Sequence, residues 1–401
     1  MKQTQPTENP NCPVVDYVYS PPPTPVGWLF DRLDRYQDMS RPAVWTEEGK
    51  GYWIFTDHDA LLEGLQQADL WSSAVVDPTQ QDPDYMWIPI MLDPPLHAKW
   101  RRLLGAWFTP ARTKSLKEEQ QRLAAQLIER LRDKGECDYV RDFAQVLPSI
   151  VFLQIMGMPL EKLDEFMVWE HQILHGNTES DPDRSLQAAA LHKVMQYFGE
   201  LLAERRANPD PDAQDIVSAA ITWEIDGVPI PDADLINCLL QLFMAGLDTV
   251  AGEASYFMYH LAKHPEDRRR IASEPELIPH AVEELLRVYP IVQTARKATR
   301  DADFHGCPVK AGQVAHFPLS LASRDEKAHP RARTVDLDRK ETRHLAFGAG
   351  PHRCPGSHLG RQELAVMMEE WHRQIPDYEL VEEPTEHGLV LGLNSLPLRW
   401  N

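Results

Sequence analysis

The sequence predicts a mainly α-helical protein with small β-sheets, and three observations carry that prediction. Apolar residues recur at helical spacing over most of the 401 residues. Strand-like runs of aromatic and β-branched residues are few and short. The longest helical pattern is almost wholly apolar in its middle, which is typical of a helix at the centre of a fold.

Apolar periodicity places the expected elements along the chain. The expected helices cover residues 96–107, 115–133, 142–156, 161–174, 186–207, 232–263, 277–289 and 356–375. The expected strands are 51–56, 303–306 and 313–317. The helix over 232–263 is the central one, because its segment Leu239–Met244 leaves no polar face for solvent except Gln241.

The chain is expected to form a single domain over residues 1–401. No linker or internal repeat divides it, and the proline-rich segment 21–25 predicts an N-terminal arm over about residues 1–27. No uninterrupted apolar run approaches the length that spans a bilayer, and the polar N-terminus leads into no apolar signal segment. We therefore expect a soluble, cytoplasmic protein without a membrane partner.

Charge and cysteine content exclude several classes of protein. The chain has 41 Lys and Arg against 61 Asp and Glu, a formal net charge of −20, which makes nucleic acid an improbable partner. The odd number of cysteines and the lack of a short-spaced pair argue against a disulfide scaffold or a Cys-x-x-Cys zinc site. The five cysteines are Cys12, Cys137, Cys238, Cys307 and Cys354.

The segment 347–356 presents one cysteine, Cys354, on a glycine-rich loop before an apolar helix. Gly350 and Gly356 can adopt positive φ, so the backbone can lie close to a large planar partner. Pro355 suits the first position of the helix, and the helix dipole favours an anion at its N-terminus. Cys354 is therefore expected to be a thiolate that binds a metal.

A carboxylate and a hydroxyl interrupt the central helix at Asp248 and Thr249. Burying them costs free energy unless they are hydrogen-bonded or used in chemistry. Gly246 weakens the helix locally and would let a ligand approach the backbone. One interpretation is structural: Thr249 bonds back to a carbonyl one turn earlier and Asp248 pairs with a distant Arg. The other is an acid and alcohol pair that delivers protons.

These residues together resemble the cytochrome P-450 superfamily of haem-thiolate monooxygenases, in its soluble bacterial form. Phe347, Gly350, Cys354 and Gly356 match the family's Phe-x-x-Gly-x-x-x-Cys-x-Gly pattern. The segments 284–287 and 245–249 match its Glu-x-x-Arg and Ala-Gly-x-Asp-Thr patterns, and 93–101 resembles the start of its haem-flanking helix. The resemblance runs through the whole chain and implies the cytochrome P-450 fold, with haem between the long central helix and the helix after the cysteine loop.

The resemblance implies a role for each matched residue. Cys354 would be the axial ligand of haem b, and Asp248 with Thr249, assisted by Gly246, would deliver protons to bound O₂. Glu284, Arg287 and Arg339 would tie the late helix to the loop before the cysteine. The other residues expected to bind haem, in part through its propionates, are His97, Arg101, Arg296, His352, Phe347, Gly348 and Gly356.

The resemblance also implies the reaction and its partners. One oxygen atom of O₂ would enter a C–H bond of the substrate and the other would leave as water. The chain has no Gly-x-Gly-x-x-Gly and no second cysteine cluster, so electrons must come from separate proteins, a ferredoxin and an NAD(P)H-dependent ferredoxin reductase. Basic residues that would suit an acidic ferredoxin are Arg339, Lys340, Arg343, His344, His352, Arg353, His358 and Arg361, with Arg101, Arg102, Arg112 and Lys114.

An apolar and bulky set of residues outlines the expected substrate pocket. It favours a small to medium hydrophobic substrate such as a terpenoid or a substituted aromatic, with a fatty acid or steroid as the alternative. Each of these residues can also be explained as simple core, and for about half of them that explanation is favoured. The candidates are Tyr85, Trp87, Ile88, Phe243, Met244, Leu247, Ile291, Val292, Thr294 and Leu393.

The same residues admit three other functions. A haem-thiolate peroxygenase would not need Asp248 and Thr249, and a non-enzymatic haem sensor or carrier would use neither that pair nor an apolar pocket. A zinc site is the third, because His and Cys are ligands that zinc accepts. Its ligands would be His344, His352, Cys354 and His358.

Overall fold

The computed structural model describes residues 12–175, 179–388 and 390–401. The chain separates into two compact units. The first unit comprises Met1–Met86, Ile90–Ala98 and His280–Cys354, and the second comprises Trp87–Pro89, Lys99–Pro279 and Pro355–Asn401. That the whole chain folds as a single domain stays a prediction.

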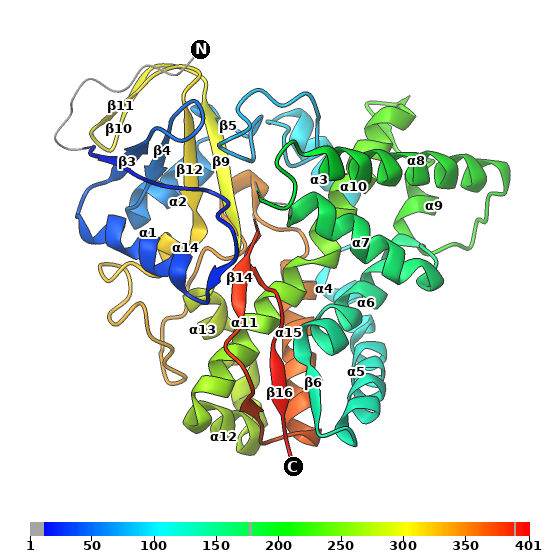
Figure 1. The fold of residues 1–401 in the computed structure, drawn as a ribbon. Helices are drawn as coiled ribbons and strands as arrows, with labels where there is room; N and C mark the ends of the chain where they lie inside the picture. Colours follow the sequence, from blue (N-terminus) through cyan, green and yellow to red (C-terminus); the bar gives the residue numbers. More distant parts are fainter. Residues whose placement is uncertain (1–11, 176–178, 389) are drawn as a thin grey trace. The chain divides into compact units, whose positions relative to one another are not determined.

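The first unit is built around a six-stranded sheet with the order β1-β3-β4-β12-β9-β5. Pairs β1 and β3, and β4 and β12, are parallel, whereas the other neighbours are antiparallel. Figure 1 shows β4, β12 and β9 side by side. The strands are β1 (Val14–Val15), β3 (Ala43–Thr46), β4 (Tyr52–Phe55), β5 (Trp71–Ser72), β9 (Gln293–Ala298) and β12 (Val314–Pro318).

Aromatic side chains fill the core of this sheet. The rings of Phe55 and Phe317 stack with centroids 5.3 Å apart, and Trp71 meets both rings edge-on. Each aromatic side chain buries more apolar area than an aliphatic one, so short strands are sufficient to form the core of this sheet. The register then sets Arg296 of β9 opposite Ala315 of β12.

Short helices and a hairpin complete the first unit. The hairpin joins β10 (Ala302–Phe304) to β11 (Cys307–Val309), and β2 (Thr24–Pro25) is a further short strand. The thiol of Cys307 lies 2.8 Å from that of Cys12, a proximity that the sequence did not indicate. The helices are α1 (Trp28–Asp38), α2 (His58–Gln66), α14 (Leu319–Ser323) and α13 (Ile278–Val288), whose first two residues belong to the second unit.

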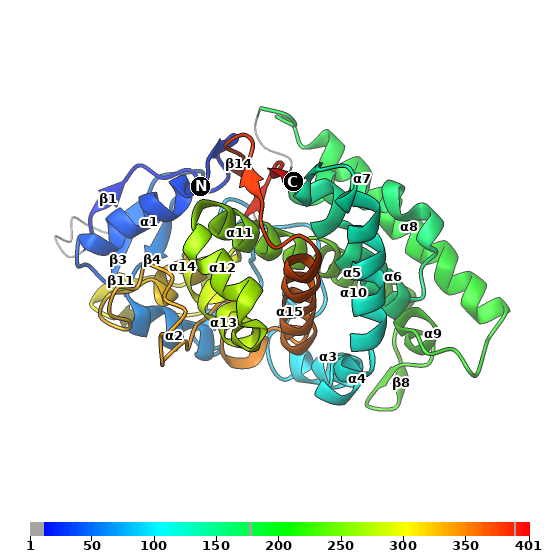
Figure 2. The same ribbon diagram turned by 90° about the horizontal axis from the view of Figure 1, so that it is seen from below.

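The second unit is mainly helical. In Figure 2 α15 lies beside α12, and it also contacts α5 and α11. Helix α10 contacts α6, α7 and α8. The helices are α3 (Leu96–Gly105, starting in the first unit), α4 (Pro110–Ser115), α5 (Lys117–Arg132), α6 (Val146–Met156), α7 (Leu163–Leu174), α8 (Ser185–Ala207), α9 (Ile216–Ala220), α10 (Asp232–Leu247), α11 (Thr249–Lys263), α12 (Pro265–Ser273) and α15 (Ser357–Gln374).

Small strands border these helices. β6 (Glu136–Asp138), β16 (Pro397–Arg399) and β13 (Glu379–Leu380) form one antiparallel sheet. Two hairpin-like pairs join β7 (Glu224–Ile225) to β8 (Val228–Pro229), and β14 (Thr385–His387) to β15 (Gly392–Leu393). The predicted fold class, mainly α with small sheets, is therefore confirmed.

The expected helices all occur, with one change. The pattern over 232–263 forms two helices, α10 and α11, because the helix is interrupted at Asp248, whose φ and ψ are −112° and −41°. The stretch Asp232–Lys263 is long and apolar enough to cross a membrane by length and composition, although it contains no uninterrupted apolar run of that length. Its most apolar window is 61% buried inside the protein, as in the core helix of a folded domain.

Candidate functional site

The loop that carries Cys354 is closed by its own backbone. The amide of Cys354 donates to the carbonyl of Phe347 at 2.8 Å. Gly348 and Gly350 have φ of +68° and +67°, a region that side chains disfavour. A Cβ on Gly350 would lie 2.4 Å from the carbonyl oxygen of Leu65, so this position has no room for a side chain. The loop therefore holds the half-buried Cys354 against a fixed backbone.

Two details of the loop differ from the prediction. Gly356 has φ of −79°, so it does not use the freedom of glycine. Helix α15 begins at Ser357 with Gly356 as its N-cap, which leaves Pro355 before the helix instead of at its first position. Cys354 consequently lies three residues before the first helical residue, because the chain makes a turn at Pro355 and Gly356 before the helix begins.

Three polar residues predicted to bind the haem propionates, His97, Arg296 and His352, lie in the first unit. The rings of His97 and His352 are 3.9 Å apart at 36°. Arg296 is 4% exposed, and its Nη1 donates to Thr294 Oγ1 and to the carbonyl of Ala295, both at 2.7 Å. Arg101 lies four residues after His97 on α3 and belongs to the second unit.

The guanidinium of Arg296 is buried without an ion pair. Burial lowers its pKa to about 10, against the opposing charge of Asp93. Asp93 instead accepts hydrogen bonds from Ser72 Oγ at 2.5 Å and from the amide of Ser73 at 2.8 Å. Among the described residues no carboxylate lies within 4.0 Å of the guanidinium of Arg296. A buried cation of this kind is stabilised when an anionic ligand binds beside it.

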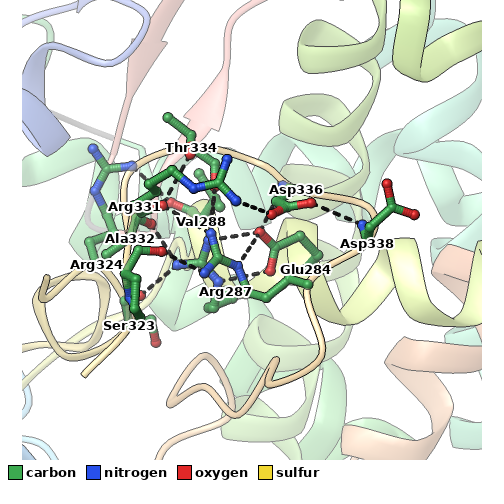
Figure 3. Close-up of polar contacts among 12 residues, drawn as sticks. Glu284, Arg287, Val288, Ser323, Arg324, Arg331, Ala332, Thr334, Asp336 and Asp338 are labelled. Carbon is green, nitrogen blue, oxygen red and sulfur yellow. Dashed lines mark hydrogen bonds and ion pairs between the residues drawn. The ribbon is translucent and has the colours of Figure 1, made fainter. Parts of the chain in front are cut away.

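Glu284 and Arg287, two of the three residues predicted to brace the loop before Cys354, lie within a network of polar contacts (Figure 3). Glu284 and Arg287 are completely buried and form two hydrogen bonds of 2.8 Å. Arg339 Nε donates to Glu284 Oε1 at 2.9 Å, and so does the amide of Asp336. Arg287 also donates to the carbonyls of Ser323, Ala332 and Thr334 at 2.9, 2.5 and 3.0 Å.

In the second unit, the acid and alcohol pair lies at the junction of α10 and α11. Thr249 Oγ1 donates to the carbonyl of Ala245 at 3.0 Å, which is the local bond of the structural interpretation. Gly246 faces α6, where a Cβ would lie 2.3 Å from the ring of Phe152. Close helix packing therefore requires the glycine.

The buried partner of Asp248 is a histidine, not the arginine that the structural interpretation expected. His175 Nε2 lies 3.0 Å from Asp248 Oδ1 and 3.7 Å from Glu170 Oε1. Burial alone would lower the pKa of His175, but the charge and hydrogen bond of Asp248 and the charge of Glu170 raise it to about 9. Burial and the charge of Asp248 hold the pKa of Glu170 well above its ordinary value.

The pKa of Asp248 is lowered, in contrast to that of Glu170. Burial raises its pKa, yet the charge and hydrogen bond of His175 outweigh burial and lower it. Contact with Asp248 therefore favours the charged form of His175, contact with His175 favours the charged form of Asp248, and burial favours the neutral form of Glu170. Sequence reasoning missed this group, since Glu170 and His175 follow an ordinary helical pattern 73 or more residues before Asp248.

Two further histidines surround His175. The ring of His387 on β14 is 4.4 Å from that of His175, and the ring of His171 on α7 is 5.2 Å away. A Cβ on Gly388 would lie 2.6 Å from Nδ1 of His175, so the backbone at Gly388 packs directly against the imidazole. The five titratable residues at this place come from α7, the α10–α11 junction and β14.

The candidate substrate residues are divided between the units. In the first unit Tyr85 is half-buried, Ile291 is fully buried, Val292 is half-buried, and the hydroxyl of Thr294 accepts from Arg296. In the second unit the ring of Phe243 packs edge-on against Phe166 and Phe198, with Met244 and Leu247 buried beside it on α10. The remaining candidates, Trp87, Ile88 and Leu393, are half-buried, buried and buried.

Some of the basic residues near Cys354 are engaged inside the protein. Arg339 binds Glu284, and His344 Nε2 lies 3.2 Å from Glu283. Lys340, Arg343 and Arg353 are exposed, with Arg343 91% exposed in its side chain. Arg112 is held over the ring of Trp107 at 3.9 Å.

Comparison with known proteins identifies the family. The family model for cytochrome P450 matches residues 79–371. A probable cytochrome P450 127A1 of Sinorhizobium fredii is 32% identical over 387 residues, which cover 94% of this chain and 91% of that protein. A steroid C26-monooxygenase of Mycobacterium tuberculosis is 30% identical over 374 residues, covering 91% of this chain and 92% of that protein. The crystal structure of CYP101J2 superposes with a TM-score of 0.86 at 28% identity and covers 99% of this chain and 100% of that chain.

The family is defined by haem b held on a cysteine thiolate, and named relatives are monooxygenases and hydroxylases. The chain belongs to the bacterial cytochrome P450 monooxygenases.

Proposed function

We propose that this monooxygenase inserts one atom of O₂ into a C–H bond of a small to medium hydrophobic molecule, a terpenoid or a substituted aromatic. One observation carries the proposal: the interruption of the apolar core helix at Asp248 and Thr249. A buried acid beside an alcohol is an arrangement that moves protons, and a haem protein without oxygen chemistry has no use for it.

The residues of the first unit fit haem as a ligand. Cys354 offers the thiolate, Gly350 lets the loop backbone pack closely, and Arg296 is a buried cation that a propionate would neutralise. His97 and His352 would bind the propionates as further donors, and Phe347 and Gly348 would form the loop around the ligand. The family resemblance also assigns Arg101 and Gly356, which belong to the second unit, to haem binding. Haem on a thiolate supplies electron density that favours cleavage of the O–O bond.

The protein's own residues position and move protons. Asp248 would hold a proton close to Thr249, whose hydroxyl can both accept and donate, and Gly246 would keep this part of α10 close to α6. The brace of Glu284, Arg287 and Arg339 would hold the Cys354 loop in place. Tyr85, Trp87, Ile88, Met244, Leu247 and Leu393, with the other apolar candidates, would exclude water from the substrate.

Electrons would come from a ferredoxin served by an NAD(P)H-dependent reductase. The exposed Lys340, Arg343 and Arg353 support an acidic partner, whereas Arg339 and His344 are engaged within the protein and contribute less. Charge reversal of Arg343 and Arg353 should slow reduction by an acidic [2Fe–2S] ferredoxin under carbon monoxide. Reversal of Lys263, on the C-terminal end of α11, is the matched control. We propose that the enzyme works in the cytoplasm, as bacterial relatives of this kind suggest.

Two measurements test the proposal. The reduced protein with carbon monoxide should show the absorption band of a thiolate-ligated haem, and Cys354→His should lose it; a band of histidine ligation in the wild type would reject Cys354. Terpenoids, alkylphenols, fatty acids and steroids are then titrated while the haem spin state is recorded. The steroid C26-monooxygenase relative makes steroids the alternative substrate class, and a spin-state change with steroids alone would favour it.

The acid and alcohol pair is tested by Thr249→Ala. This variant should keep the carbon monoxide band and ligand binding, yet divert reducing equivalents into peroxide. Product formation as tightly coupled to NAD(P)H consumption as in the wild type would remove Thr249 from proton delivery. Activity supported by hydrogen peroxide alone would instead favour a peroxygenase.

A further inference from the structure

A group of titratable side chains leads from the protein surface to Asp248. His171 is exposed, His387 is half-buried, and His175 is 7% exposed. Asp248 is 6% exposed and Glu170 1% exposed. His171 is therefore the exposed end of the group, whereas His175, Asp248 and Glu170 are all buried.

Several polar atoms of this group have no hydrogen-bond partner among the described residues. They are Asp248 Oδ2, Glu170 Oε1, His175 Nδ1 and His387 Nδ1. Buried polar atoms are usually satisfied, and places where they are not are often functional. Of the two nitrogens of His175, Nε2 faces Asp248, whereas Nδ1 lies on the side of the ring that packs against Gly388 and has no hydrogen-bond partner among the described residues.

The three histidines of the group differ in the direction of their pKa shifts. Burial and the charge of His175 lower the pKa of His387 to about 3 and also lower that of His171. His175 is the one histidine of the three whose pKa is raised. The proton is therefore held at the deepest imidazole, directly beside the acid.

We propose that His171, His175 and Asp248 form a proton path from the surface to Thr249, in which His175 orients Asp248 and supplies its protons. The inference rests on the proposed role of Asp248 and Thr249 in proton delivery. His175 is a positioning residue that acts through Asp248. Glu170 Oε1, 3.7 Å from His175 Nε2, is the second carboxyl group that faces this imidazole.

Each cycle of the proton path transfers one proton from solvent toward Thr249 and moves no electrons. Nε2 of His175 gives its proton to Oδ1 of Asp248, which leaves a neutral imidazole and a neutral carboxyl. The carboxyl passes a proton on toward the hydroxyl of Thr249. One proton from solvent then restores the imidazolium by way of His171, whose ring is 5.2 Å from that of His175, a separation that one water can bridge.

The matched control lies at the other end of the same helix. His260 Nε2 is 2.9 Å from Asp267 Oδ2, so it forms a similar buried histidine and carboxylate pair. It lies twelve residues after Asp248, about 18 Å along a helix. His260→Gln therefore removes a histidine that contacts a carboxylate from a place that does not serve Thr249, although burial lowers the pKa of His260 whereas the pKa of His175 is raised.

The first readout does not depend on activity. Histidines of the carbon monoxide complex are labelled with ¹⁵N and titrated by NMR in buffer containing EDTA. The resonance that His175→Gln removes should titrate with a midpoint near pH 9 in the wild type, and Asp248→Asn should lower that midpoint by about 2 units or more. A midpoint below 7 in the wild type would overturn the proposal.

The second readout is the consumption of NADPH without added substrate, with a ferredoxin and its reductase. His175→Gln should slow it at least tenfold at pH 7–8 and raise its solvent deuterium isotope effect, with His171→Gln changing it in the same direction. Equal behaviour of the His175→Gln and His260→Gln variants would overturn the path. One equivalent of tightly held zinc that EDTA removes would also overturn it, since Glu170, His175 and Asp248 would then be ligands. If neither Asp248→Asn nor Thr249→Ala changes the NADPH consumption, the proposed role of this pair in proton delivery is refuted. If these two variants change it and His175→Gln does not, only the proton path through His175 is refuted.

Discussion

The substitution Arg287→Lys tests whether the buried brace is held by the shape of a guanidinium or by its charge. The five hydrogen bonds of Arg287 go to both oxygens of Glu284 and to the carbonyls of Ser323, Ala332 and Thr334. A lysine keeps the charge but has three donors on one nitrogen, so at least two buried acceptors lose their partner.

The magnitude follows from those two acceptors. Each buried acceptor left unsatisfied costs about 1–3 kcal/mol, so the variant should lose about 2–6 kcal/mol. Unfolding entropy of about 2.1 cal/mol/K per residue makes 1 kcal/mol worth about 1.2 °C in Tm for a chain of 401 residues. The expected fall in Tm is therefore about 2–7 °C.

Differential scanning calorimetry of the haem-loaded protein at one scan rate measures this fall. Arg331→Lys is the matched control, because Arg331 contacts Asp336 in the same loop at 2.5 Å but is 72% exposed in its side chain. An exposed pair contributes about 0–1 kcal/mol, so this control should shift Tm by about 1 °C or less. Equal shifts for the two variants would refute the argument that the fork of Arg287 stabilises the loop before Cys354.

Three further predictions follow from the same contacts. Gly246→Ala should destabilise the protein by about 1–3 kcal/mol through overpacking, and Phe152→Leu in the same chain should recover part of the loss in a urea titration; no recovery would contradict the contact. Gly350→Ala should reduce haem content in a pyridine haemochromogen assay, because the Cβ meets a backbone carbonyl at a positive φ, whereas Gly105→Ala, with nothing within 4 Å, should not. The pKa of His175 is raised to about 9, so its stabilising contribution is complete below pH 6.5 and is lost as the pH rises through 9. The variant His175→Gln should therefore remove about 3 kcal/mol from the pH dependence of the unfolding free energy measured in urea. An unchanged pH profile would contradict the pairing of His175 with Asp248.

Apolar periodicity was sufficient to predict the long helices, since burial of one face determines both their existence and their spacing. The Cys354 loop was predictable for a different reason, because its glycines and its cysteine lie within ten residues. Strand β9 was not predicted: its sequence, Gln293–Ala298, lacks alternation, and it is a strand because β12 and β5 pair with it across the fold. Gly246 was assigned to ligand approach, whereas the packing of Phe152 explains it, and no local pattern reports a contact with a residue 94 positions away.

The type of side chain that pairs with Asp248 decides what this contact can do. The structural interpretation of the sequence paired Asp248 with an arginine, which stays charged at every working pH and would only anchor the carboxylate. Histidine is the side chain whose charge can change near neutral pH, so the same contact becomes a store from which a proton can leave. The neutral His171 and His387 around it keep that proton at the deepest position, 3.0 Å from the acid. The identity of the side chain at position 175, directly after α7, thus decides whether the contact only anchors Asp248 or also supplies it with a proton. The variant His175→Lys separates these two roles. A lysine keeps the ion pair with Asp248, but its higher pKa should slow proton release.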